Sequence, residues 1–101
     1  MVQTELALQY QRLVRRRFPS CIVADVGAGP EDTTVLDVFF VPDNNMADFD
    51  LYLYDRIRPD AEAEGIDWAL LIPHSVANTV SRYPDAVGLV KNSKSAISAA
   101  G

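Results

Sequence analysis

Cysteine and histidine are nearly absent from this sequence, which contains one residue of each kind. A single cysteine cannot form a disulfide within the chain, and it excludes a zinc site built from several cysteines. We therefore predict a protein of the reducing cytoplasm that holds neither a metal ion nor another cofactor.

Basic residues and long apolar runs are also scarce. Nine Lys and Arg residues stand against fourteen Asp and Glu, so the formal net charge is −5. Such a chain lacks the excess of clustered cations that general nucleic-acid binding requires. No apolar run approaches the roughly 20 residues that cross a bilayer. We expect neither nucleic acid nor a membrane as a partner.

The composition is otherwise that of a globular protein. The chain has 101 residues, of which 49% are hydrophobic and 23% charged. This length matches one domain with one modest core. We predict a single α/β domain over residues 1–91, followed by a disordered Ser/Ala tail over residues 92–101 that has little apolar surface to bury.

The stretch from Thr33 to Val41 is the richest in β-branched and aromatic residues and ends at Pro42, so it predicts a strand. Alternation places Thr34, Leu36, Val38 and Phe40 on one face and Val35, Asp37, Phe39 and Val41 on the other. Both faces are apolar apart from Asp37. We therefore expect a central strand that is covered on both sides.

Helical spacing of apolar residues predicts a first helix that Thr4 caps and Pro19 stops, and a second helix from Met46 to Glu64 with Gly65 at its end. Pro59 either kinks the second helix or splits it in two. Alternation at Phe49–Ile57 also permits a strand there, although a helix supplies the crossover that a parallel strand needs.

The remaining elements are shorter. The sequence predicts strands at Cys21–Val26 and Asp67–Ile72, a short helix at Val76–Tyr83 and a last edge strand at Ala86–Val90. The order α-β-β-α-β-α predicts an α+β two-layer sandwich with a three- or four-stranded mixed sheet and helices mainly on one face. The first two strands form a hairpin, and the third runs parallel to the second.

Three polar residues are candidates for chemistry: Asp25, Asp37 and His74. If the hairpin is centred near Glu31, Asp25 and Asp37 fall nearly opposite each other on one face, an arrangement that suits Mg²⁺ or a general acid. Alternatively the register keeps them apart, and Asp37 lies near an open edge where it is hydrated or bonded to a neighbouring side chain. His74 follows Pro73 at a strand end, where it is either a general base or a plain surface residue.

The cluster Arg15–Arg17 permits two interpretations. It could bind phosphate, or it could complement the carboxyl end of the first helix and solubilise one face. An isolated basic cluster in an acidic domain favours the second interpretation.

The layout from Cys21 to Ile72 resembles that of the small nucleotidyltransferase domains. That family carries Gly-Ser after its first strand and an Asp-x-Asp pair on its second. Here Gly27 is followed by Ala28, and Val35 stands two residues before Asp37, where the first Asp of the pair belongs. The resemblance implies a similar scaffold without the usual activity.

No complete catalytic constellation is present in the sequence. We therefore predict a small non-catalytic interaction module that binds a protein partner or forms a weak homodimer. Its binding surface would be the second face of the sheet, with Val35, Phe39 and Val41 exposed beside Val23 and Leu71. The alternative is a small enzyme or ligand-binding domain on a nucleotidyltransferase-like scaffold that uses Asp25, Asp37 and His74.

Overall fold

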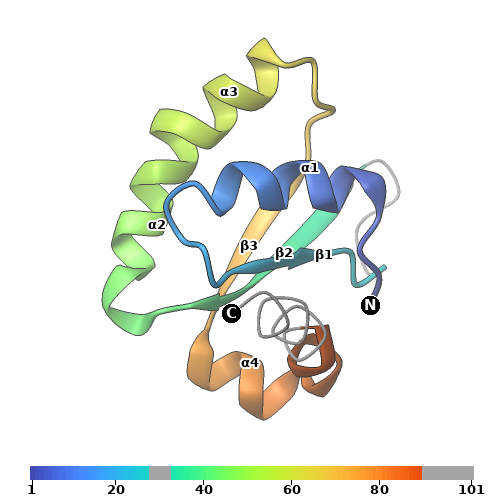
Figure 1. Ribbon diagram of the computed structural model, residues 1–101, viewed down its shortest axis with the longest axis vertical. Coiled ribbons are helices and arrows are strands. Elements are labelled where there is room, and N and C mark those ends of the chain that lie inside the picture. The colour runs from blue at the N-terminus through green and yellow to red at the C-terminus, as the bar shows by residue number, and fades with distance from the viewer. Residues whose placement is uncertain (28–32, 90–101) are drawn as a thin grey trace, which may run out of the picture.

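A computed structural model describes residues 1–27 and 33–89. The elements follow the predicted order α-β-β-α-β-α (Figure 1). They are α1 (Glu5–Val14), β1 (Ile22–Ala24), β2 (Val35–Val41), a 3-10 turn (Asp43–Asn45), α2 (Met46–Tyr52), a π turn (Leu53–Ile57), α3 (Arg58–Ala63), β3 (Leu70–Ser75) and α4 (Val76–Arg82). The predicted tail at residues 92–101 lies outside the described residues.

The sheet has three described strands in the order β1-β2-β3, with β1 antiparallel and β3 parallel to β2. The mixed sheet is therefore confirmed. In Figure 1, α1 and the long α2–α3 helix lie on one side of the sheet and α4 on the other. We call the side of α1 the first face and the side of α4 the second face.

Local sequence signals explain where the helices begin and end. The Thr4 hydroxyl accepts the N–H of Ala7 at 3.1 Å, which makes Thr4 the N-cap of α1 as predicted. Gly65 has φ +70°. Its N–H bonds to Glu62, and the N–H of Ile66 bonds to Ala61, the pair of bonds that ends a helix at a left-handed residue.

A π turn carries the long helix through Pro59, which stands in the first turn of α3. Residues 46–63 are helical without interruption. The N–H of Arg58 bonds to Leu53, five residues earlier, where an α-helix would use Tyr54. This wider turn accommodates the proline ring, which in a regular α-helix clashes with the carbonyl four residues before it.

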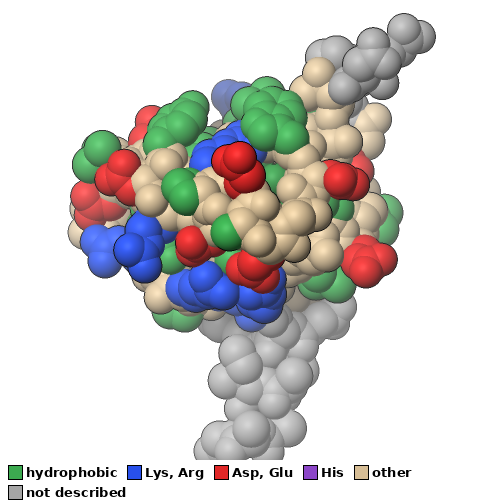
Figure 2. All heavy atoms as spheres, turned by 90° about the horizontal axis from the view of Figure 1, so that it is seen from above, with side chains coloured by type: hydrophobic (Ala, Val, Ile, Leu, Met, Phe, Trp, Pro, Cys, Tyr) green, Lys and Arg blue, Asp and Glu red, His purple; other side chains and the backbone are tan. Residues whose placement is uncertain are grey.

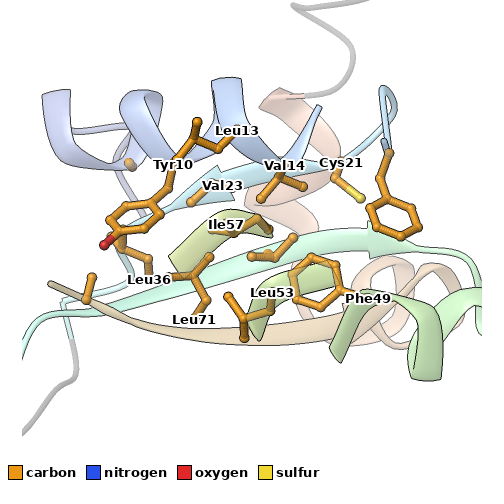
Figure 3. Close-up of a cluster of buried hydrophobic side chains, with 14 of the residues drawn as sticks. Tyr10, Leu13, Val14, Cys21, Val23, Leu36, Phe49, Leu53, Ile57 and Leu71 are labelled. Atoms are coloured by element: carbon orange, nitrogen blue, oxygen red, sulfur yellow. The ribbon is translucent and has the colours of Figure 1, made fainter. Parts of the chain in front are cut away.

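The main core lies between the first face and the helices that cover it. Figure 3 shows side chains from α1, the long helix and all three strands converging in one layer. Its fully buried members include Tyr10, Leu13, Val23, Leu36, Phe49 and Ile57. The Tyr10 hydroxyl is satisfied by donating to the carbonyl of Asp67 at 2.7 Å.

A bulge near the end of β2 reverses the predicted alternation. Val38 pairs with Pro73 and Val41 pairs with Ser75, so β2 carries one residue more than β3 over this interval. Phe40 adopts φ +69°, a strained conformation for a bulky residue. As a result Val41 packs in the main core while Phe39 and Phe40 both contact the second-face cluster.

The second face is covered by α4 and by a further helical segment at residues 84–89. The predicted edge strand at Ala86–Val90 is therefore wrong over residues 86–89, and Val90 lies outside the described residues. Pro84 starts the segment, where its fixed φ and missing N–H favour a helix. Ala86 is buried against Ile22, Ala24 and Phe39.

Candidate functional site: a buried Asp37–His74–Asn78 chain

The structure brings Asp37 and His74 into direct contact on the second face. Asp37 lies in the middle of β2, and its register partner on β3 is Ile72. His74 is two residues further along β3, so its side chain projects from the same face. The parallel pairing of β2 and β3 thus joins two residues that are 37 positions apart in the sequence.

The contact is a short hydrogen bond within a chain of three side chains. His74 Nε2 lies 2.5 Å from Asp37 Oδ1, and His74 Nδ1 lies 3.1 Å from Asn78 Nδ2. A donating amide nitrogen of Asn78 at Nδ1 matches the tautomer of His74 that carries its proton on Nε2 and donates it to Asp37. The side chains of His74 and Asp37 are only 11% and 7% exposed.

Aromatic rings enclose the imidazole. The ring of Phe39 stacks on His74 with centroids 5.2 Å apart and an interplanar angle of 16°. Tyr83 packs against both rings, at 4.8 Å from His74 and 5.0 Å from Phe39. His74 is thus held on both nitrogens and by two neighbouring rings, and the prediction of a plain surface residue is wrong.

Sequence reasoning missed Asn78 and Tyr83. Asn78 stands four residues after His74, and Ser75 caps α4 between them with its hydroxyl accepting the Asn78 N–H at 3.1 Å. The position of Asn78 could have been predicted from this cap, because a helix that starts at Ser75 brings residue 78 back toward the end of β3. The position of Tyr83 depends on how α4 packs, which no local pattern encodes.

Asp25 does not join this group. The partner of Asp37 on β1 is Ala24, so Asp25 lies one position out of register and projects toward the opposite face. It lies beyond β1, pairs with Val2, and its Oδ1 accepts the N–H of Gly27 at 2.7 Å. The prediction that Asp25 and Asp37 share a face is wrong. Within residues 1–27 and 33–89, no three His, Cys, Asp or Glu residues gather as metal ligands do.

The arginines near the end of α1 pair with carboxylates of the long helix. Arg12 bonds to Glu64 at 2.5 Å and Arg16 to Asp60 at 3.2 Å, while Arg17 lies 3.7 Å from Asp48. Figure 2 shows basic and acidic side chains side by side at the α3 end of the molecule. These pairs favour the interpretation of a solvated, charge-balanced surface over a phosphate site.

Cys21 is fully buried, and its thiol donates to the carbonyl of Phe40 at 3.7 Å. Burial raises the pKa of Cys21 from 9.0 to about 11, although nearby Arg15 acts in the opposite direction. The side chain is therefore a neutral thiol at physiological pH, unsuited to act as a nucleophile.

The residues predicted to form the binding surface do not share an open face. Phe39 and Val41 are fully buried in two different clusters, and Val35 alone is half-buried. Val23 and Leu71 are also buried, in the main core. The expectation is wrong for two reasons: the bulge reverses Val41, and α4 with residues 84–89 covers Phe39.

The buried chain is better suited to hold α4 on the sheet than to perform catalysis. Both ring nitrogens of His74 already have partners, so neither is available as a base in this arrangement. Thr79 is a second link between α4 and the sheet. Its hydroxyl donates to the carbonyl of Ser75 at 2.7 Å and accepts the N–H of Phe40 on β2 at 3.3 Å. Asp37 Oδ2 is buried and has no partner among the described residues.

Comparisons of the chain with protein-family models, curated proteins and solved structures give no match. In the described part of the chain, no helix combines the length and the apolar character that a membrane span requires.

Proposed function

We propose that this chain is a non-catalytic interaction module that associates weakly with a second copy of itself. The observation that carries the proposal is an apolar row at the β3 edge of the second face. Leu70 and Ile72 alternate along β3 and are 39% and 38% exposed. Val35 is the register partner of Leu70 and is half-buried beside it. We call Val35, Leu70 and Ile72 the open row.

The open row is what α4 and residues 84–89 leave uncovered. These helical segments cover the β1 side of the second face, where Ile22, Ala24 and Phe39 are fully buried. Directly before β3, Trp68 is 60% exposed and carries the guanidinium of Arg58 over its ring at 4.8 Å. Trp68 lies beside α3, with Ala61 and Glu62, and is therefore not part of the open row.

The outer edge of β3, which pairs with no strand in the described part of the chain, favours a contact through side chains over backbone pairing. The N–H of Leu70 donates to the carbonyl of Thr34, the residue directly before β2, so by alternation Leu71 and Pro73 direct their backbone groups away from β2. Pro73 has no N–H to offer. Arg58 already occupies the carbonyl of Ala69 at 2.6 Å. Strand addition along this edge is therefore disfavoured.

An apolar row is complementary to itself across a two-fold axis, which makes a second copy the simplest partner. Complete burial of a Leu or Ile side chain contributes about 1.5–3 kcal/mol, and here only part of each side chain remains to be buried. Association costs an estimated 4–15 kcal/mol. Even with both copies contributing, this burial barely exceeds the lower end of that cost, so we expect a dimer that dissociates in the millimolar range.

Sedimentation across a concentration series tests the proposal. The average mass should rise with concentration, and Ile72→Asp should abolish the rise because a buried carboxylate would face the partner. Leu8→Asp on the exposed side of α1 is the matched control and should associate like the parent chain. A strictly monomeric mass up to several millimolar, or an equal effect of both variants, would refute the proposal.

The alternative, a small enzyme or ligand-binding domain that uses Asp37 and His74, has less support. The two side chains do meet, but Asp25 lies elsewhere and both nitrogens of His74 are engaged. The alternative would gain support from an activity that His74→Gln abolishes while the folded structure is retained.

A further inference from the structure

A cavity of about 310 Å³ lies between α3 and the segment that leads into β3. Its lining comes from α1, α3 and this segment: Tyr10, Arg58, Ala61, Glu62, Ile66 and Trp68. None of these residues belongs to the open row or to the Asp37–His74–Asn78 chain. Small-molecule sites combine apolar walls with a few placed polar groups, as this lining does.

Two parts of the lining are held in position by contacts with the rest of the fold. The guanidinium of Arg58 donates to the carbonyl of Ala69 at 2.6 Å, and its central carbon lies 4.8 Å from the centre of the Trp68 ring. A guanidinium has five N–H donors, so donors remain for a ligand. Tyr10 is buried, and its hydroxyl donates to the carbonyl of Asp67 at 2.7 Å. The lining is therefore preorganised, which lowers the cost of binding.

The cavity presents one cation and one anion that are not paired with each other. Arg58 and Glu62 stand four residues apart on α3, so their side chains lie on the same side of the helix. In the part of the chain that the structure describes, neither side chain joins an ion pair, whereas Arg12, Arg16 and Arg17 each pair with a carboxylate. A basic residue that precedes an acidic one at this spacing is also the weaker order for a pair. Such a cavity suits a ligand that carries both charges.

We propose that this cavity binds a free α-amino acid with an apolar side chain. The carboxylate of the ligand accepts hydrogen bonds from Arg58, whose planar donors match a carboxylate, and the ammonium group pairs with Glu62. The apolar side chain packs on Ala61, Ile66 and Trp68. The Trp68 side chain is 60% exposed, so covering part of its ring contributes to binding. A simple carboxylate or a simple amine would satisfy only one of the two charges.

Fluorescence titration with L-leucine tests the assignment. Trp68 is the only tryptophan of the chain, so its emission reports on this cavity alone. We expect a saturable change with L-leucine. N-acetyl-leucine lacks the ammonium charge and leucinamide lacks the carboxylate. Each should bind about three- to tenfold more weakly than L-leucine, because contacts between partly exposed charges contribute modestly.

Two variants separate the charged contacts from an effect on the fold. Glu62 is exposed, so Glu62→Gln should keep the fold, weaken L-leucine about three- to tenfold and leave N-acetyl-leucine unchanged. Arg58→Gln should weaken L-leucine and leave leucinamide unchanged, since leucinamide has no carboxylate to lose. Asp55→Asn is the matched control, because Asp55 is an exposed carboxylate on the long helix outside the cavity, and it should bind L-leucine like the parent chain.

Three outcomes would overturn the proposal. The first is the absence of a saturable change in Trp68 emission with L-leucine at tens of millimolar. The second is equal binding of L-leucine, N-acetyl-leucine and leucinamide, which would remove the roles of Arg58 and Glu62. The third is an equal loss of L-leucine binding in Glu62→Gln and Asp55→Asn, which would indicate a general electrostatic effect instead of a site.

Discussion

Asp37 and His74 form a hydrogen bond of 2.5 Å between neighbouring parallel strands, on the face of the sheet that α4 covers. Asn78 on α4 completes the chain by bonding to the other ring nitrogen. The bond therefore connects the centre of the sheet with the helix that follows β3. Two of the predictions below concern buried polar groups that connect α4 with the sheet, and the effect of removing each can be measured separately.

His74→Phe should destabilise the protein by about 3–5 kcal/mol. The phenyl ring can keep the stacking on Phe39, but it leaves the Asp37 carboxylate buried without its donor. Urea denaturation measures the loss. Adding Asp37→Leu to His74→Phe should recover much of it, since buried pairs can often be replaced by apolar residues. Strictly additive losses in the double variant would mean that the two side chains do not act as a pair.

Thr79→Val should cost about 1–3 kcal/mol although it preserves the shape of the side chain. The substitution leaves the N–H of Phe40 buried without an acceptor at the strained position of β2. Thr34→Val is the control, because Thr34 is exposed, and its free energy of unfolding should change by less than about 0.5 kcal/mol. Equal small effects in both variants would show that Thr79 does not hold the bulge.

Leu53→Ala and Leu51→Ala should differ sharply although they lie two residues apart on one helix. Leu53 is 4% exposed and packs in the main core, whereas Leu51 is 65% exposed. The first substitution should cost about 2–5 kcal/mol. The second should stay within about 0.5 kcal/mol. Thermal or urea unfolding measures both changes. Similar losses of unfolding free energy in the two variants would contradict the assignment of Leu53 to the buried face of the helix.

The stability of the protein should fall as the pH rises from about 9 to 11. The pKa of Cys21 is about 11 in the folded chain against 9.0 ordinarily, so in this interval the unfolded chain binds fewer protons than the folded one. Two pKa units correspond to at most about 2.7 kcal/mol. In the Cys21→Ala variant, the free energy of unfolding should decline less steeply with pH over this range than in the parent chain. Identical slopes in the variant and the parent chain would contradict the assignment to this thiol.

Features that depend on a few neighbouring residues could be predicted from the sequence. Thr4 and Gly65 mark helix ends through bonds to residues within four positions, and both behave as predicted. The alternation of β2 holds as far as Phe39. It fails at Phe40, because the bulge depends on Thr79 from α4 and on the pairing with β3. Local patterns do not encode such distant partners.

In the candidate site, too, the residues themselves could be singled out from the sequence, whereas their contacts depend on distant parts of the chain. Asp37 and His74 were recognisable as polar residues at unusual positions, but their contact follows from the register of two parallel strands. Asp25 was misplaced by one residue, and in a strand one residue changes the face. Residues 86–89 were ambiguous because a short apolar run fits a strand and a buried helix equally well.

Pro73 sets a limit on how large any assembly of this chain can grow. When a strand of a second molecule pairs with a free strand edge, the added strand exposes a free edge of its own. Pairing of this kind can therefore repeat and form fibrils. On the outer edge of β3, unpaired within residues 1–27 and 33–89, Pro73 lacks an N–H donor and the carbonyl of Ala69 already accepts a hydrogen bond from Arg58. Contacts made by the side chains of one sheet face instead close on themselves. The protein should therefore remain free of cross-β polymer even at concentrations where its copies meet.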